Sequence, residues 1–161
     1  MKILGVDPGT ALIGVGLITY ENKKFLFSSC SCIKTDKIND TAQRLDDLFV
    51  QLSKVIDEFE PDVMAVEDIF FFKNLKTAIK VSQARGVILL AAARKKIKVF
   101  EYTPLQVKQA LTGYGRAEKR QVQQMVKAIL KLEEGFQSDD AADALAVAIC
   151  CAHSIKNDKI Y

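Results

Sequence analysis

The sequence lacks any long hydrophobic run. It has 161 residues, of which 49% are hydrophobic and 27% charged, yet no uninterrupted apolar stretch approaches the ~20 residues that a membrane-spanning helix needs. The apolar run at the N-terminus is interrupted at Asp7, which is too early for the core of a secretory signal peptide. We therefore expect a cytoplasmic protein that does not associate with a membrane. Its length and composition predict one globular domain over residues 1–161.

Histidine and cysteine are also scarce, which argues against a zinc site. The chain has one histidine, His153, and four cysteines, at positions 30, 32, 150 and 151. Their spacing matches no standard zinc finger or zinc ribbon. We interpret the cysteines as free thiols that pack like small hydrophobic residues, as is usual in a reducing compartment.

Acidic residues are rare in one long segment of the chain. Residues 73–131 contain 14 Lys or Arg but only two acidic residues, Glu101 and Glu118, whereas the rest of the chain has 9 basic and 18 acidic residues. The segment therefore carries a charge of +12 and the remainder −9, although the net charge is only +3. Such segregation is typical of a protein that binds a polyanion such as nucleic acid. Solvated helix faces would produce the same pattern, so charge alone leaves both interpretations open.

The hydrophobic pattern predicts an α/β fold. Short apolar runs at 3–6, 12–20 and 25–33 predict three antiparallel strands, and runs at 63–66 and 97–102 predict two more. Helical periodicity and capping residues predict helices that begin near Asp40, Lys76, Thr103, Ala117 and either Ser138 or Asp139. We expect a five-stranded mixed sheet, its first three strands antiparallel, flanked by helices.

Carboxylates stand at the ends of two predicted strands and at the start of the last predicted helix. Asp7 follows the first apolar run and Glu67 follows the fourth. If these strands are neighbours, the two side chains lie together and repel each other unless a cation lies between them. Asp140 and Asp143 are three residues apart, so they share one helix face. A turn at Asp7 and a helix cap at Asp139 or Asp140 would explain those residues without any function.

A site built from these four carboxylates would offer only hard oxygen ligands. Such ligands favour Mg²⁺ or Mn²⁺ over zinc. Two divalent cations roughly 4 Å apart form a known clamp for in-line displacement at phosphorus. Together with the basic segment and the absence of a Walker motif, the carboxylates predict hydrolysis of phosphodiester bonds.

Six short blocks of the sequence closely resemble the RuvC family of Holliday-junction resolvases. They are Ile3–Thr10, Val66-Glu67 with Phe70 and Lys73-Asn74, Gln83–Val87, Gln106–Gln109, Ala117–Lys119 and Asp140–Ala146. The blocks follow one another over nearly the whole chain. The resemblance implies a ribonuclease-H-like fold and a homodimer that nicks two strands of a four-way DNA junction symmetrically in recombination and repair, leaving 5′-phosphate and 3′-hydroxyl ends. It also implies work with the RuvA–RuvB branch-migration complex.

The resemblance assigns catalytic and metal-binding roles to the four carboxylates. Asp7, Glu67, Asp140 and Asp143 match the acidic positions of the family. They would hold two Mg²⁺ ions per active site, or Mn²⁺ in their place. One ion would lower the pKa of a water molecule that attacks phosphorus, and the other would stabilise the leaving 3′ oxygen.

The resemblance also indicates residues that contact DNA. Lys108 and Lys119 match basic positions near the scissile phosphate, so we count them as catalytic candidates, and Phe70 matches an aromatic residue that meets bases near the junction centre. The full set of candidate DNA contacts is Phe70, Lys76, Lys80, Arg85, Lys108, Arg116, Lys119 and Arg120.

A few positions depart from the family pattern, namely Asp68, Asp139, Phe71 and Phe72. Because Asp140 matches the acidic position of the family, Asp139 is expected at or near the N-cap of the last helix. Two other functions stay open at this point. One is a ribonuclease-H-type nuclease that acts on an RNA–DNA hybrid, and the other is a non-catalytic nucleic-acid-binding module of the same fold. The intact set of mutually repelling carboxylates argues against the second.

Overall fold

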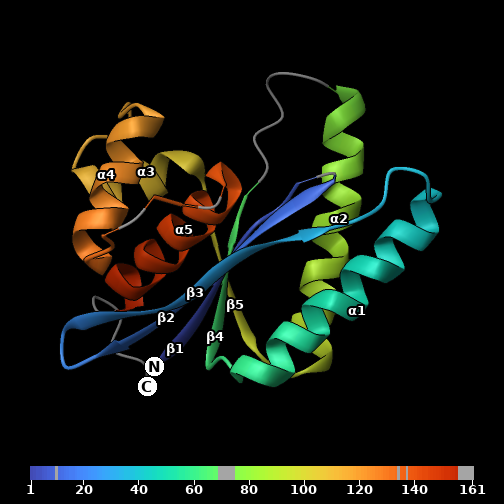
Figure 1. Cartoon of the computed structure of the whole chain (residues 1–161), viewed down its shortest axis with the longest axis horizontal. Coiled ribbons are helices and arrows are strands. Elements are labelled where there is room, and N and C mark those ends of the chain that lie inside the picture. The colour runs from blue at the N-terminus through green and yellow to red at the C-terminus, as the bar shows by residue number, and fades with distance from the viewer. Residues whose placement is uncertain (10, 69–74, 134, 137, 156–161) are drawn as a thin grey trace.

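The centre of the fold is a five-stranded sheet with the strand order β3-β2-β1-β4-β5 (Figure 1). Its strands are β1 (Lys2–Asp7), β2 (Leu12–Glu21), β3 (Lys24–Lys34), β4 (Val63–Glu67) and β5 (Lys98–Tyr102). β1, β2 and β3 are antiparallel neighbours, and β4 and β5 join the other side of β1 as parallel strands. The predicted mixed sheet, with its first three strands antiparallel, is confirmed, and it has the ribonuclease-H-like arrangement.

The computed structural model describes residues 1–9, 11–68, 75–133, 135–136 and 138–155, with only the backbone of 75–77. Phe70, Phe71 and Phe72 lie outside the described residues, as does the side chain of Lys76. None of the helices in the described ranges is long and apolar enough to span a membrane.

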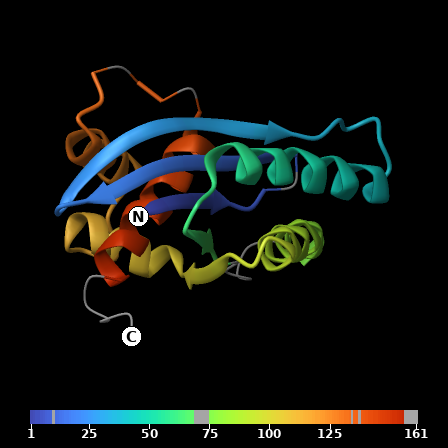
Figure 2. The same ribbon diagram turned by 90° about the horizontal axis from the view of Figure 1, so that it is seen from below.

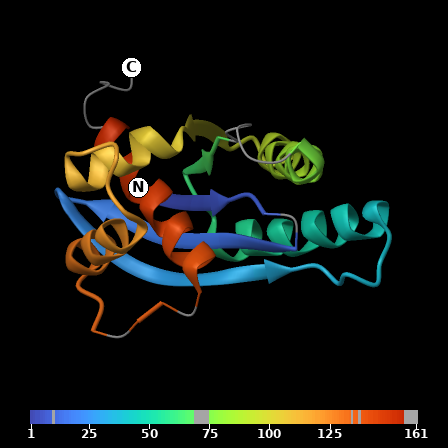
Figure 3. The same ribbon diagram turned by 90° about the horizontal axis from the view of Figure 1, so that it is seen from above.

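Helices cover both faces of the sheet, as the views along two further directions show (Figures 2 and 3). α1 (Thr41–Phe59) and α2 (Leu75–Arg94) pack on one face, whereas α3 (Pro104–Thr112), α4 (Lys119–Leu130) and α5 (Asp139–Ile155) pack on the other. Successive side chains of a strand point into opposite layers. Ile3 belongs to the core beneath α3, α4 and α5, and Leu4 belongs to the core beneath α1 and α2.

The predicted helix starts at Asp40 and Thr103 are confirmed as capping boxes. The Asp40 carboxylate accepts the backbone N–H of Gln43 at 2.8 Å, and the Gln43 side chain accepts the backbone N–H of Asp40. Thr103 and Gln106 form the same arrangement before α3. The start predicted near Ala117 is two residues early, because Glu118 is the N-cap and α4 begins at Lys119.

A two-residue turn connects β2 and β3. Asn22 and Lys23 form it, and both have positive φ values, of 50° and 62°. Two consecutive residues of this conformation are typical of a type I′ hairpin turn, which matches the twist of the flanking strands.

The buried helix α5 packs directly against the backbone of β1 and β2. A Cβ atom added at Gly5 would lie 2.1 Å from the carbonyl oxygen of Ala144, and one at Gly14 would lie 2.0 Å from that of Asp140. Only residues without a side chain permit such a close approach. The first turn of α5 is therefore held against β2, the neighbour of the strand that carries Asp7.

Candidate active site

Asp7 and Glu67 lie side by side at the carboxyl ends of two parallel strands. β1 and β4 pair with Val6 opposite Val66, so the residues that follow each valine are also neighbours. The two carboxyl side chains share a hydrogen bond. The sequence predicted this contact on the condition that the two strands are neighbours, and the strand order meets that condition.

Burial and crowding of negative charge raise the pKa values of these two carboxyl groups. For Asp7 burial is the largest cause, followed by the charge of Glu67 and then that of Asp143, and together they raise its pKa to about 9. Burial also raises the pKa of Glu67, against the opposing effect of its hydrogen bond with Asp7. Two neighbouring carboxyl groups hold a proton more readily than one carboxyl group alone, because two negative charges repel each other. A bound cation would relieve the same repulsion.

Two of the acidic residues of α5, Asp140 and Asp143, complete the group of four. The charges of Asp143 and Asp140 both contribute to the raised pKa of Asp7, which places them within electrostatic reach of it. Burial, and then the charges of Asp139 and Asp140, raise the pKa of Asp143 despite its bond to Lys119. The structure thus places the other three predicted carboxylates within electrostatic reach of Asp7.

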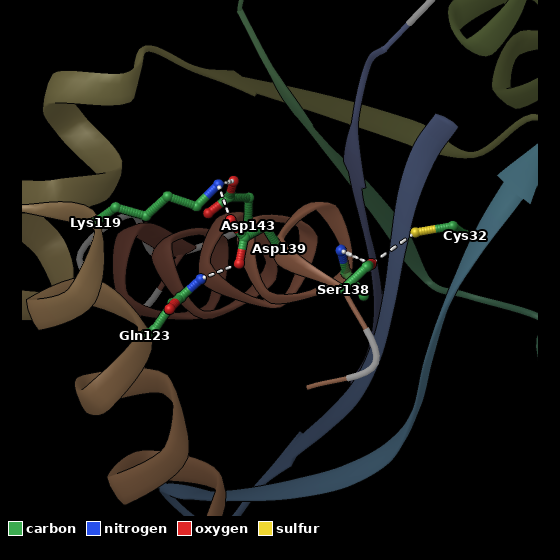
Figure 4. Close-up of polar contacts among 7 residues, drawn as sticks. Cys32, Lys119, Gln123, Ser138, Asp139 and Asp143 are labelled. Carbon is green, nitrogen blue, oxygen red and sulfur yellow. Dashed lines mark hydrogen bonds and ion pairs between the residues drawn. The ribbon is translucent and has the colours of Figure 1, made fainter. Parts of the chain in front are cut away.

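A cavity of about 190 Å³ opens beside these carboxylates. Its lining includes Glu67 and Asp143 together with Lys108 of α3 and Lys119 of α4. The Nζ atom of Lys119 lies 2.8 Å from Oδ2 of Asp143 and 3.4 Å from Oδ2 of Asp139 (Figure 4). Partial burial lowers the pKa of Lys119, but its bonds to these carboxylates outweigh burial and raise it overall. The cavity therefore combines carboxylate oxygens with the ammonium groups of two lysines.

The N-cap of α5 is Ser138, not Asp139. The Ser138 hydroxyl accepts the backbone N–H of Ala141 at 3.1 Å, and its Oγ also lies 2.9 Å from Sγ of Cys32 on β3 (Figure 4). Asp139 is the first residue of α5, and its carboxylate accepts the side-chain amide of Gln123 at 2.9 Å. Asp139 therefore lies next to the N-cap, as expected, but the hydroxyl of Ser138 and not the carboxylate of Asp139 makes the capping bond.

The other described candidates for DNA contact do not line this cavity. Arg116 is exposed just before α4, Arg120 is exposed in its first turn, and Lys80 is exposed on α2. The guanidinium of Arg85 forms ion pairs with Asp68 and Glu101, and its side chain is only 23% exposed.

Comparison with known proteins places the chain in a family. The family model described as "Crossover junction endodeoxyribonuclease RuvC" matches residues 3–151. The chain belongs to the RuvC family. A RuvC protein of Pelotomaculum thermopropionicum is 55% identical over 153 residues, covering 95% of this chain and 93% of its own. The RuvC protein of Alkaliphilus metalliredigens is 53% identical over 154 residues, covering 96% and 94%.

Solved structures of the RuvC family have the same fold. The structure of Thermus thermophilus RuvC superposes with a TM-score of 0.91 at 35% identity, over 98% of this chain and 96% of that one. A structure of T. thermophilus RuvC in complex with a Holliday junction substrate superposes with a TM-score of 0.89 at 32% identity, over 98% and 97%.

Members of the RuvC family are expected to depend on a divalent metal, and the donor chemistry of this site fits one. Asp7, Glu67, Asp140 and Asp143 offer carboxylate oxygens, and burial, followed by neighbouring negative charge, raises the pKa values of Asp7, Glu67 and Asp143. In the part of the chain that the structure describes, no three acidic, cysteine or histidine side chains form a ready-made metal cluster.

Two contributors to the site were not predicted from the sequence, whereas Ser138 was one of the two predicted starts of the last helix. Gln123 bonds Asp139, and Gly14 allows α5 to contact β2. Gln123 stands four residues after Lys119, a spacing that places both side chains on one helix face. That spacing is a signal that could have indicated Gln123, whereas no local pattern distinguishes Gly14.

Proposed function

We propose that this chain is a metal-dependent endodeoxyribonuclease that resolves four-way DNA junctions by nicking two strands symmetrically, leaving 5′-phosphate and 3′-hydroxyl ends. Membership of the RuvC family supports the activity and the substrate. The observation that carries the assignment of the site is the meeting of Asp7 and Glu67 with the first turns of α5, beside a cavity lined by Lys108 and Lys119.

The four carboxylates Asp7, Glu67, Asp140 and Asp143 would hold the metal, which we propose to be two Mg²⁺ ions per site, with Mn²⁺ able to replace them. When bound, the ions supply an activated water and neutralise charge on the reacting phosphate. The carboxylates of the chain fix where the ions lie, since Asp7 and Glu67 come from a rigid sheet and Asp140 and Asp143 from a buried helix.

The two lysines of the cavity would act on the DNA itself. The ammonium groups of Lys108 and Lys119 can neutralise the negative charge that develops on the phosphate oxygens during displacement. Glu67, Asp143 and the two lysines line the same cavity, so a phosphate that contacts the lysines lies near these two carboxylates. The outer basic residues Lys80, Arg116 and Arg120 would bind the flanking phosphates, and we propose that Phe70 and Lys76 also contact the junction.

We further propose that the chain acts as a homodimer through α2. Ile79 and Leu90 of α2 are 63% and 52% exposed although both are large and apolar. Eleven residues separate them, which is three helical turns, so they share one face. Gly86 lies between them on the same face and has open space around it, so two such helices could cross closely there. Two copies related by a two-fold axis would present two sites to two equivalent strands.

The oligomeric state can be tested with a matched pair of substitutions. Leu90→Asp should give a monomer by light scattering at micromolar concentration, because a charge would be buried in the interface. Leu105→Asp, at a leucine of α3 that is 57% exposed on the other face of the sheet, should stay dimeric. A monomeric parent chain, or a dimeric Leu90→Asp variant, would contradict the proposed interface.

The family also suggests a partner, a compartment and a domain organisation. We propose that the chain works with the RuvA–RuvB complex in the cytoplasm, as one domain. The free state of Cys30, Cys32, Cys150 and Cys151 supports a reducing compartment. One sheet with helices on both faces supports the single domain.

The choice of substrate is tested by one comparison. The chain is incubated with a synthetic four-way junction, a linear duplex and an RNA–DNA hybrid, each with Mg²⁺ or with EDTA. We expect paired nicks in the junction with Mg²⁺ and no nicks with EDTA. Preferential cutting of the hybrid would favour the ribonuclease-H-type alternative, and binding without any cutting would favour the non-catalytic module.

A further inference from the structure

Lys119, which lines the cavity, is held by polar contacts that connect α4 with the start of α5 (Figure 4). Its Nζ atom contacts Oδ2 of Asp143 at 2.8 Å and Oδ2 of Asp139 at 3.4 Å. The other carboxylate oxygen of Asp139 accepts the Nε2–H of Gln123 at 2.9 Å. Gln123 lies one turn after Lys119 on α4, so the contacts run from α4 to the first residue of α5 and back to α4.

This arrangement differs from an ordinary surface ion pair. An exposed lysine and an exposed aspartate usually gain little from pairing, because two long side chains must be ordered to make one contact. Here the side chain of Asp139 is 70% exposed, but Gln123 fixes one of its oxygens and the start of α5 fixes its backbone. A carboxylate that is already ordered can hold the Lys119 ammonium at a smaller cost in side-chain freedom.

The two carboxylates that contact Lys119, those of Asp143 and Asp139, have different roles. Asp143 is one of the four proposed metal ligands, so its oxygens would be shared when a metal is bound. Asp139 is the first residue of α5 and is bonded to Gln123 instead. Asp139 can therefore keep its contact with Lys119 whatever Asp143 binds.

We infer that Asp139, fixed by Gln123, is a positioning residue that holds the Lys119 ammonium where it meets the scissile phosphate. The inference rests on the proposed function, because it takes Lys119 to act on the phosphate. It gives a role to Asp139, one of the acidic residues that depart from the family pattern. Gln123 supports this role because it holds the Asp139 carboxylate in place. Asp139 is not needed as the helix cap, because Ser138 holds that position.

A double-mutant cycle on junction cleavage tests the inference. Under single-turnover conditions with saturating protein and Mg²⁺, Asp139→Ala should slow cleavage about 10-fold, the usual effect of losing an outer support of a site. Junction affinity should stay unchanged, so the effect falls on the rate and not on binding. Asp139→Glu should restore part of the rate. In a Lys119→Ala background, Asp139→Ala should cause no further loss.

Gln123→Ala should give a smaller loss of the same kind, and this loss too should vanish in the Lys119→Ala background. Gln124→Ala is the matched control, because Gln124 is the neighbouring residue of α4 and is exposed. It should cleave like the parent chain. Equal effects of the two glutamine substitutions would overturn the role of Gln123.

A second readout uses the metal-free protein and needs no activity. Acylation of lysines by a limiting amine-reactive ester is mapped by peptide mass spectrometry, with exposed Lys54 of α1 as the reference. Asp139→Ala should raise the labelling of Lys119 several-fold relative to Lys54, because the amine is no longer held by two carboxylates. Unchanged labelling, together with additive losses of cleavage in the cycle, would overturn the inference.

The cycle separates failure of this inference from failure of the proposed function. If Lys119→Ala slows cleavage but Asp139→Ala does not, the positioning role is wrong and the assignment of Lys119 stands. If Lys119→Ala cleaves at the parental rate, the assignment of Lys119 is wrong and the positioning role falls with it.

Discussion

A Cβ atom at Gly14 would lie 2.0 Å from the backbone oxygen of Asp140, so β2 and the first turn of α5 are in direct backbone contact. Gly14 is also the pairing partner of Asp7 across β1 and β2. One residue without a side chain therefore sets the distance between a carboxylate on the sheet and the carboxylates on the helix. The active site depends on this contact as much as on its acidic residues.

Gly14→Ala should disrupt both the fold and the site. A methyl group placed 2.0 Å from backbone must push α5 away from the sheet, and overpacking of this kind costs about 1–3 kcal/mol or more. We expect a lower melting temperature and loss of junction cleavage. Thr19→Ala, in the same strand but opposite Lys2 at the other end of β1, should change cleavage little. A Gly14→Ala variant with parental stability and activity would contradict the contact.

Ser138→Ala should cost about 1 kcal/mol of stability, the usual loss for a helix N-cap. For a chain of this size that corresponds to a fall of roughly 2–4 °C in melting temperature. The hydroxyl also contacts Cys32, so Cys32→Ala should give a smaller fall. Asp139→Ala is the comparison, since it leaves the cap intact, and it should melt close to the parent chain. The reverse order of the serine and aspartate variants would restore Asp139 as the cap.

The raised pKa of Asp7 should make the stability of the metal-free protein depend on pH. A carboxyl group with a raised pKa binds its proton more tightly in the folded state. The stabilisation is therefore fully present below the unfolded value of 3.8 and is lost as the pH rises toward about 9. Asp7→Asn removes this loss. In EDTA at pH 8 the variant should melt several degrees above the parent chain, and the difference should shrink as the pH falls toward 4.

Asp46→Asn provides the control for this pH series, because Asp46 is exposed on α1. Its melting temperature should follow that of the parent chain at every pH. If Asp7→Asn also followed the parent chain, Asp7 would not be held among repelling carboxylates.

Junction binding should weaken steeply with salt, because Lys and Arg residues that neutralise phosphates release counterions from the DNA. Replacing Lys80, Arg116 or Arg120 by alanine should each reduce the slope of log Kd against log salt by about 1. Lys37→Ala, at an exposed lysine outside the basic segment, should leave the slope unchanged. A dissociation constant that does not change with salt would contradict the role of the basic segment.

The elements and the acidic residues of the site were largely predictable because their signals are local. The capping boxes at Asp40 and Thr103 follow from residues three positions apart. The positions of Asp7 and Glu67 at strand ends follow from the apolar runs before them. Their contact also requires the two strands to be neighbours, which no local pattern in the sequence shows.

The supports of the site were not predictable, because they connect residues that are distant in the sequence. Cys32 and Ser138 are 106 positions apart, and Gln123 and Asp139 are 16 apart. A single sequence contains no pattern that pairs them. The same holds for Arg85. Its place in a basic segment did not reveal its ion pairs with Asp68 and Glu101, which lie 17 and 16 positions away in the sequence.

The most direct test of the account is junction cleavage and junction binding measured together on Asp7→Asn and Glu67→Gln. Each substitution removes one metal-binding oxygen and some repulsion of the DNA phosphates while keeping the shape of the side chain. With Mg²⁺, we predict that both variants lose cleavage of a synthetic four-way junction in nicking assays, yet bind it as tightly as the parent chain, or more tightly, in gel shifts. Loss of binding in step with cleavage, or cleavage that survives both substitutions, would contradict the assignment of this carboxylate group as the catalytic centre.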